Sequence, residues 1–154
     1  MTSLFQNLLI WHILLGLGGT AFFIAALVVM LRDKLRLKAL KTHTLLGAMG
    51  IIGSWIAGGY YYTNYYGKAV KPLIKASDYP WAHKVIMETK EHIFLFLPIL
   101  GLTAVLTVWL SGDLLEKEPK LRKATALLIL TIALLGVAIA LMGVGVSGAV
   151  GQGV

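Results

Sequence analysis

The sequence contains no cysteine and few charged residues. Without cysteine, the chain cannot form disulfide bonds, thiolate metal sites, iron–sulfur clusters or a covalent c-type haem attachment. Charged residues make up 14% of the chain and hydrophobic residues 58%. So few charges could not cover a water-facing surface, and the composition therefore predicts an integral membrane protein. The sequence also lacks an internal repeat, a phosphate-binding loop, a nucleophile elbow and a dinucleotide-binding fingerprint.

Four long apolar runs dominate the sequence, at about 8–31, 43–62, 92–110 and 124–146. An α-helix needs about 20 apolar residues to cross roughly 30 Å of hydrocarbon. Residues 1–7 hold no Lys or Arg, and no small-residue cleavage site follows the first run, so we expect it to be retained rather than removed as a signal peptide. The sequence predicts an all-α fold, a four-helix transmembrane bundle that forms a single membrane domain over residues 1–154.

The basic residues are concentrated in two short loops, 32–42 and 111–123. Neither tail contains Lys or Arg, and only five lysines are spread over the longer segment 63–91. Because loops rich in Lys and Arg stay in the cytoplasm, we expect a multi-pass protein of the inner (plasma) membrane with both termini on the non-cytoplasmic side. The net charge of +7 follows from this topology, so nucleic-acid binding is not expected.

The outer segment 63–91 is predicted to have structure of its own. Asp78 can cap a helix and Pro80 is tolerated in a first turn, so the third helix should begin near residue 80 and project well beyond the membrane. Aromatic residues gather around this segment and predict a belt at the level of the lipid headgroups. These residues are Tyr60, Tyr61, Tyr62, Tyr65, Tyr66, Tyr79 and Trp81.

Four histidines are the main candidates for chemistry, because polar side chains in membrane helices are costly and usually have a task or a partner. On the expected topology His12 and His92 lie near the outer boundary, and His43 lies at the cytoplasmic mouth of the second span. His12 shares a helix face with Gly16 and Gly19. This seam of small residues either leaves room for a flat macrocycle or serves helix packing alone.

In the third helix, Glu88 and His92 are four residues apart and are predicted to share a face, with His83 on nearly the opposite side. Glu88 is therefore a candidate metal ligand beside His92, or a carboxylate that orients the imidazole of His92. The alternative is an exposed charge paired with a neighbouring lysine.

His12 and His92 together suggest the two axial ligands of one b-type haem held between facing helices. Its propionates would then pair with Lys84 or Lys90 near the headgroups. On Trp11-His12, His43-Thr44 and Glu91-His92, the chain resembles small four-helix membrane cytochromes of the b type in general plan. A second haem would need His43 and a partner such as Met30; otherwise His43 caps its helix or pairs with a lipid phosphate.

Three functions are compatible with these residues. The first is a respiratory-complex subunit that passes electrons from quinol in the bilayer to an outer redox partner through haem b. The second is a non-redox accessory or anchor subunit of a larger membrane complex. The third is a small proton or metal transporter using Glu88, Glu91 and His92, although no charge lies at mid-bilayer, where a proton path would need one. In each case we expect membrane lipid and other subunits as partners, with quinone as a further candidate, rather than a stand-alone enzyme.

Overall fold

The computed structural model describes residues 2–153, and within this range the chain is all helix and turn, without strands. The predicted all-α class is confirmed. The helical segments are, in chain order, α1 (Ser3–Met30), α2 (Leu37–Tyr61), η1 (Tyr62–Val70), α3 (Lys71–Ala76), η2 (Ala82–Met87), α4 (Glu88–Leu110), α5 (Leu114–Lys117) and α6 (Pro119–Gly153). The segments η1 and η2 are π-helical. Met1 and Val154 lie outside the described residues. They are the predicted bounds of the single domain and the two termini that we expected on the non-cytoplasmic side.

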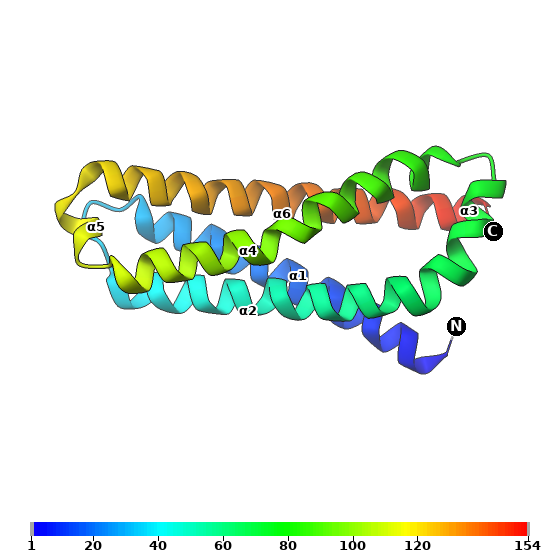
Figure 1. The fold of residues 1–154 in the computed structure, drawn as a ribbon, viewed down its shortest axis with the longest axis horizontal. Helices are drawn as coiled ribbons and strands as arrows, with labels where there is room; N and C mark the ends of the chain where they lie inside the picture. Colours follow the sequence, from blue (N-terminus) through cyan, green and yellow to red (C-terminus); the bar gives the residue numbers. More distant parts are fainter. Residues whose placement is uncertain (1, 154) are drawn as a thin grey trace.

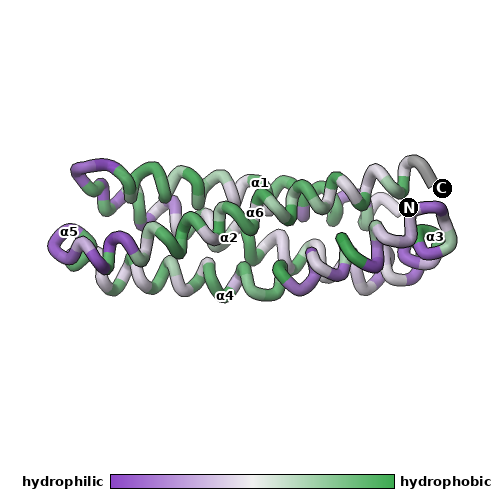
Figure 2. The backbone as a smooth tube through the Cα atoms, turned by 90° about the horizontal axis from the view of Figure 1, so that it is seen from above, coloured by the Kyte–Doolittle hydropathy of each residue, from purple (hydrophilic) through white to green (hydrophobic). Residues whose placement is uncertain are grey.

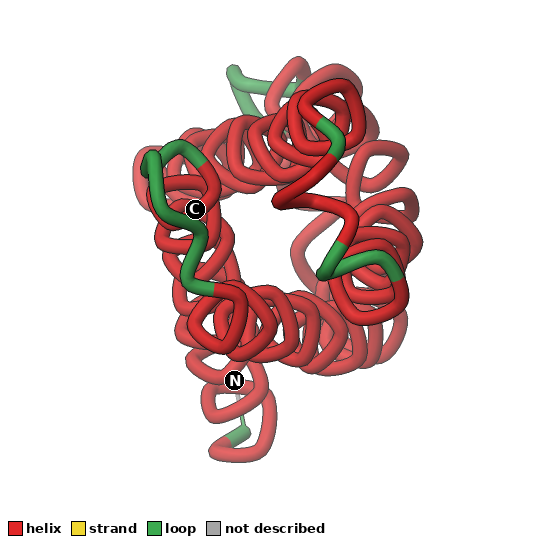
Figure 3. The backbone as a smooth tube through the Cα atoms, turned by 90° about the vertical axis from the view of Figure 1, so that its left-hand side faces the viewer, coloured by secondary structure: helices red, strands yellow, loops and turns green. Residues whose placement is uncertain are grey.

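The long helices α1, α2, α4 and α6 run lengthwise along the molecule (Figure 1). Each packs against two of the others, in the cyclic order α1, α2, α4, α6 and back to α1. Seen from one end, they surround a common centre (Figure 3). The short segments η1, α3 and η2 close one end of the molecule, and α5 lies at the other end (Figure 1).

Within the described residues, three helical stretches are long and apolar enough to cross a membrane: Ser3–Met30, Ala82–Leu110 and Pro119–Gly151. The helix α2 contains all but the last residue of the predicted span 43–62 and is not one of the three. It carries five glycines and ends in tyrosines, whereas the other helices carry more leucine and isoleucine. Hydrophobic residues cover the middle of the molecule and hydrophilic residues gather at its two ends (Figure 2), so a membrane location is plausible.

Glycines let the backbones of neighbouring helices approach closely. A Cβ atom on Gly19 of α1 would lie 2.8 Å from the backbone nitrogen of Ile51 and 2.9 Å from the carbonyl oxygen of Gly47, both in α2. A Cβ atom on Gly136 of α6 would collide with the side chain of Thr20 in α1. The seam of small residues predicted on α1 is therefore filled by neighbouring helices.

One hydrogen-bonded contact joins the last helix to the end of the first. The guanidinium of Arg122 donates to the carbonyl oxygen of Met30 through Nε at 3.1 Å and through a terminal nitrogen at 2.8 Å. It also donates to the carbonyl oxygen of Arg32. Carbonyl groups at the end of a helix lack partners within that helix, so Arg122 caps α1 and orders the loop that follows.

The start of the third long helix differs from the prediction. The N–H of Tyr79 donates to Ser77 Oγ at 3.1 Å. The helical segment begins at Ala82 with Trp81 as N-cap, and no side chain caps it. The hydroxyl of Ser77 thus orders the turn before the helix without capping it, and the predicted Asp78 cap is wrong.

Candidate functional site

A cavity of about 870 Å³ lies at the end of the molecule that η1, α3 and η2 close. The buried apolar residues form two clusters, a large one shared by α1, α2, α4 and α6 and a small one that includes Tyr66 and Val146. Tyr66 and Val146 line the cavity, as does Phe94, which packs against the large cluster. Most other lining residues are aromatic, aliphatic or glycine. The lining residues with an ionisable nitrogen or a carboxylate are His12, Lys90 and Glu91. An apolar cavity of this size with a few convergent polar groups is typical of a small-molecule or cofactor site.

The imidazole of His12 is held at the edge of this cavity by α2. Its Nδ1 lies 3.0 Å from the carbonyl oxygen of Ser54, and the hydroxyl of Ser54 donates to the carbonyl oxygen of His12 at 2.8 Å. A carbonyl oxygen can only accept a hydrogen bond, so Nδ1 carries the proton and Nε2 keeps its lone pair. Metal-ligating histidines usually have this arrangement, in which the second ring nitrogen donates to a carbonyl group.

Two further residues fix the position of the His12 ring. Phe94 of α4 meets it edge to face, with ring centroids 5.6 Å apart. Gly58 of α2 lies so close that an added Cβ atom would be 2.4 Å from His12 Nδ1. Residues from α2 and α4 thus determine which way the ring points, and only glycine leaves room for it at position 58.

His92 does not line the cavity that His12 lines. Its side chain is exposed, and Nδ1 donates to the carbonyl oxygen of Glu88 in the same helix, at 2.6 Å. The α4 residues that reach the cavity are Lys90, Glu91, Phe94 and Leu95. The structure therefore does not bring the two predicted axial ligands together in this cavity.

The two lysines predicted to meet propionates are placed differently. Lys84 is exposed and does not line the cavity. Lys90 lines it, and its ammonium nitrogen reaches toward α6, where it would be 3.3 Å from a Cβ atom on Gly143. Among the described residues, Lys90 makes neither a hydrogen bond nor a salt bridge with a side chain. It is therefore available to pair with an anionic group of a ligand.

The remaining predicted site residues lie outside the cavity. Gly16 packs on α2, where a Cβ atom would be 2.9 Å from Ser54 Oγ, and Gly19 packs on the α2 backbone, so both serve helix packing. His43 is part-buried in α2, donates to the carbonyl oxygen of Ala39 in its own helix, and meets the ring of Phe22. None of the three lines the cavity.

A buried hydrogen bond that the sequence did not predict lies beside the cavity, between Tyr66 and His83. The hydroxyl oxygen of Tyr66 is 3.2 Å from His83 Nδ1, and Glu88 Oε1 is 3.9 Å from His83 Nε2. We expected Glu88 and His83 on nearly opposite sides, because that prediction assumed α-helical geometry throughout. The π-helix η2 has a longer turn, closed by i to i+5 hydrogen bonds, and this brings residues 83 and 88 to the same side.

Within the described residues, His, Asp and Glu side chains form no group of three or more that could hold a metal ion. A metal in a macrocycle needs only one or two protein ligands. Comparisons with models of known families, with curated proteins and with solved structures find no match to this chain. The function must therefore be argued from the chemistry of the site.

Proposed function

We propose that this protein is a membrane electron-transfer subunit that binds haem b in the cavity beside His12. The observation that carries the proposal is the orientation of the His12 ring. Its Nδ1 donates to the carbonyl oxygen of Ser54 and its Nε2 lone pair is free, on a side chain that lines the cavity. When bound, haem b supplies one-electron redox chemistry, which lets the chain pass electrons from quinol in the bilayer to an outer redox partner.

The other lining residues suit the same cofactor. The rings of Phe94 and of the tyrosines offer apolar contacts to a porphyrin, and Lys90 offers an ammonium group to a propionate. In the proposed site His12 would be the residue of this chain that holds the haem iron. The pairing of His12 with His92 would require His92 to leave the exposed side of α4, so the arrangement favours a single histidine ligand.

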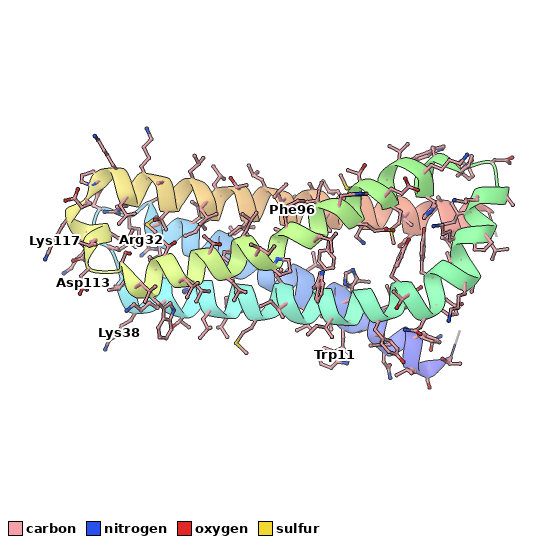
Figure 4. The ribbon with its side chains drawn as sticks, viewed as in Figure 1. Trp11, Arg32, Lys38, Phe96, Asp113 and Lys117 are labelled. Carbon is pink, nitrogen blue, oxygen red and sulfur yellow. The ribbon has the colours of Figure 1, made fainter. Side chains whose placement is uncertain are left out.

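The proposal includes a topology in which four helices cross the membrane. Helix α2 packs between α1 and α4, both of which belong to stretches long and apolar enough to span. A helix that runs lengthwise between two spans has its own ends at the same two membrane surfaces (Figure 1). Arg32, Lys38 and Lys117 gather at the end that carries α5 (Figure 4). By the positive-inside rule this end is cytoplasmic, and the cavity and both termini lie near the outer surface.

Large apolar side chains on the outside of the helices support the membrane setting. Trp11 and Phe96 are 57% and 61% exposed and point away from the molecule (Figure 4). Apolar side chains at this exposure face either lipid or neighbouring subunits. With so little mass outside the membrane, the chain would act as part of a larger respiratory complex.

The proposal is tested by the haem content of the protein purified from its native host in mild detergent. A pyridine haemochrome assay should find one b-type haem per wild-type chain, and His12→Ala should lose it. His43→Ala, at the other end of the molecule, is the matched control and should keep wild-type haem content. If wild-type protein contains no haem, the electron-transfer proposal is wrong and the accessory-subunit function takes its place.

A further inference from the structure

Tyr66 of η1 and His83 of η2 form a buried pair between the cavity and the outer end of the molecule. Tyr66 is 3% exposed and lines the cavity, and His83 is 0% exposed. Burial, with a smaller effect from the negative charge of Glu91, raises the pKa of Tyr66 to about 12. The phenol therefore keeps its proton at neutral pH and can donate it to His83 Nδ1, 3.2 Å away. A neutral His83 then carries its own proton on Nε2.

The second nitrogen of His83 lies near a carboxylate that is in contact with solvent. Nε2 is buried without a hydrogen-bond partner, and the nearest acidic oxygen is Glu88 Oε1 at 3.9 Å. The side chain of Glu88 is 51% exposed, so it is free to turn and shorten this distance to that of a hydrogen bond. Glu88 thus connects a fully buried imidazole with water.

A second buried polar atom without a partner lies on the cavity side. Glu91 lines the cavity together with Tyr66, and its Oε1 is buried without a hydrogen-bond partner. Leaving such an atom unpaired is unfavourable, so it calls for an explanation. Tyr66 and His83 also belong to two separate π-helical segments, which occur often at functional sites.

We propose that Tyr66, His83 and Glu88 form a proton relay between the cavity and the outer aqueous phase, with Glu91 as the proton acceptor on the cavity side. The relay serves a substrate that exchanges protons as well as electrons. A quinol, which gives up two protons with its two electrons, is such a substrate, and in this respect the inference rests on the proposed function. Haem b held beside His12 would take the two electrons one at a time and hand each to the outer redox partner of the proposed function.

Each transfer in the relay moves one proton and changes only O–H and N–H bonds. Protonated Glu91 passes its proton to the oxygen of Tyr66 while the hydroxyl proton of Tyr66 moves to His83 Nδ1. The Nε2 proton of His83 moves to the carboxylate of Glu88, which releases it to water. His83 is left neutral with its proton on Nδ1, and exchange between its tautomers, which returns the proton to Nε2, restores the starting state.

The charges around His83 suit such a path. Burial is the main effect that lowers the pKa of His83; the positive charges of Lys71 and Lys75 of α3 lower it further, and the negative charges of Glu88 and Glu91 of α4 oppose this. Helix α6 packs against η2, but it has no ionisable side chain after Lys123. The lysines disfavour a lasting positive charge on the ring while the carboxylates attract its proton, so a proton passes through His83 rather than staying there.

The test follows protonation of Glu91 in cofactor-free protein in detergent, by time-resolved infrared spectroscopy of its carboxyl band after a light-triggered proton release. Glu91→Gln identifies the band. We expect Tyr66→Phe and His83→Gln to slow its appearance at least about tenfold, and Glu88→Gln to slow it less. Tyr79→Phe and Asp78→Asn, at the same end of the molecule but outside the relay, should keep the wild-type rate.

Wild-type rates in Tyr66→Phe, His83→Gln and Glu88→Gln would overturn the relay. Absence of a Glu91-dependent band at every pH would overturn it as well, because the relay would then lack its cavity-side acceptor. Tyr66→Phe keeps the ring and removes only the hydroxyl, so its result stands even if His83→Gln fails to fold. Since the measurement needs no cofactor, a protein without haem would contradict the proposed function and leave this result valid.

Discussion

His12 and Ser54 are joined by two hydrogen bonds in opposite directions. His12 Nδ1 donates to the carbonyl oxygen of Ser54 at 3.0 Å, and the hydroxyl of Ser54 donates to the carbonyl oxygen of His12 at 2.8 Å. The first bond fixes the tautomer of the imidazole and the second ties α1 to α2 beside it. The position of the candidate iron ligand is thus set by the packing of these two helices.

The first prediction concerns Gly58, which leaves room for the His12 ring. In Gly58→Ala the new Cβ atom would lie 2.4 Å from His12 Nδ1, so the ring must turn away from Ser54. We expect haem content, measured by pyridine haemochrome, to fall at least about tenfold, the equivalent of about 1.4 kcal/mol of binding free energy. Gly18→Ala is the control, because its Cβ atom meets nothing within 4 Å. Equal haem content in both variants would contradict the proposed position of the ligand.

The second prediction concerns the contact between α1 and α2. Gly19→Ala places a Cβ atom 2.8 Å from the backbone nitrogen of Ile51, which cannot move without shifting α2. We expect the free energy of unfolding, measured by titration from mild detergent into sodium dodecyl sulfate, to fall by about 1–3 kcal/mol. Gly18→Ala should not destabilise the protein. A Gly19→Ala variant as stable as the wild type would mean that the two helices lie further apart.

The third prediction concerns the cap that Arg122 provides. In Arg122→Lys the positive charge stays, but the planar group that donates twice to the carbonyl oxygen of Met30 is lost. We expect faster amide hydrogen exchange in residues 30–34, measured by mass spectrometry. Lys123 is an exposed neighbour of Arg122, and in the control variant Lys123→Gln residues 30–34 should exchange their amide hydrogens as fast as in the wild type. Unchanged exchange in Arg122→Lys would show that the loop is ordered by other contacts.

The fourth prediction tests the proposed topology. The native chain has no cysteine, so each introduced cysteine is the only target for a thiol reagent. In intact cells, an impermeant reagent should label Lys75→Cys, and it should label Lys117→Cys only after the membrane is permeabilised. Both side chains are exposed in the structure. The opposite pattern would place the cavity on the cytoplasmic side.

The sequence predicted the all-α class, and the candidate ligand His12 does line a cavity. The sequence could not predict which face of α4 packs against the other helices. The buried residues of α4 are Leu97, Gly101, Ala104 and Val108, which follow the spacing of one helix face. His92 lies nine residues before Gly101, about 180° around an ideal helix, and is therefore exposed. In a membrane helix the lipid-facing side is as apolar as the core, so the pattern of hydrophobic residues does not distinguish the two.

The pair formed by His83 and Glu88 was missed for another reason. Residues five apart do not share a face of an α-helix, and the prediction for segment 80–92 used α-helical spacing. Nothing in the sequence from Ala82 to Met87 marks a π-helix. In the folded chain η2 packs against α3 and α6, and these contacts between distant segments cannot be read from the local sequence.

The most direct test of the account is chemical rescue of His12. His12→Gly, purified in mild detergent with haem supplied, should lack the Soret band of the wild type, and added imidazole should restore it, because imidazole can occupy the space of the missing ring and supply its nitrogen to the iron. His92→Gly should keep the wild-type spectrum without imidazole. A wild-type Soret band in His12→Gly before imidazole is added would show that His12 is not the ligand, and would contradict the central claim.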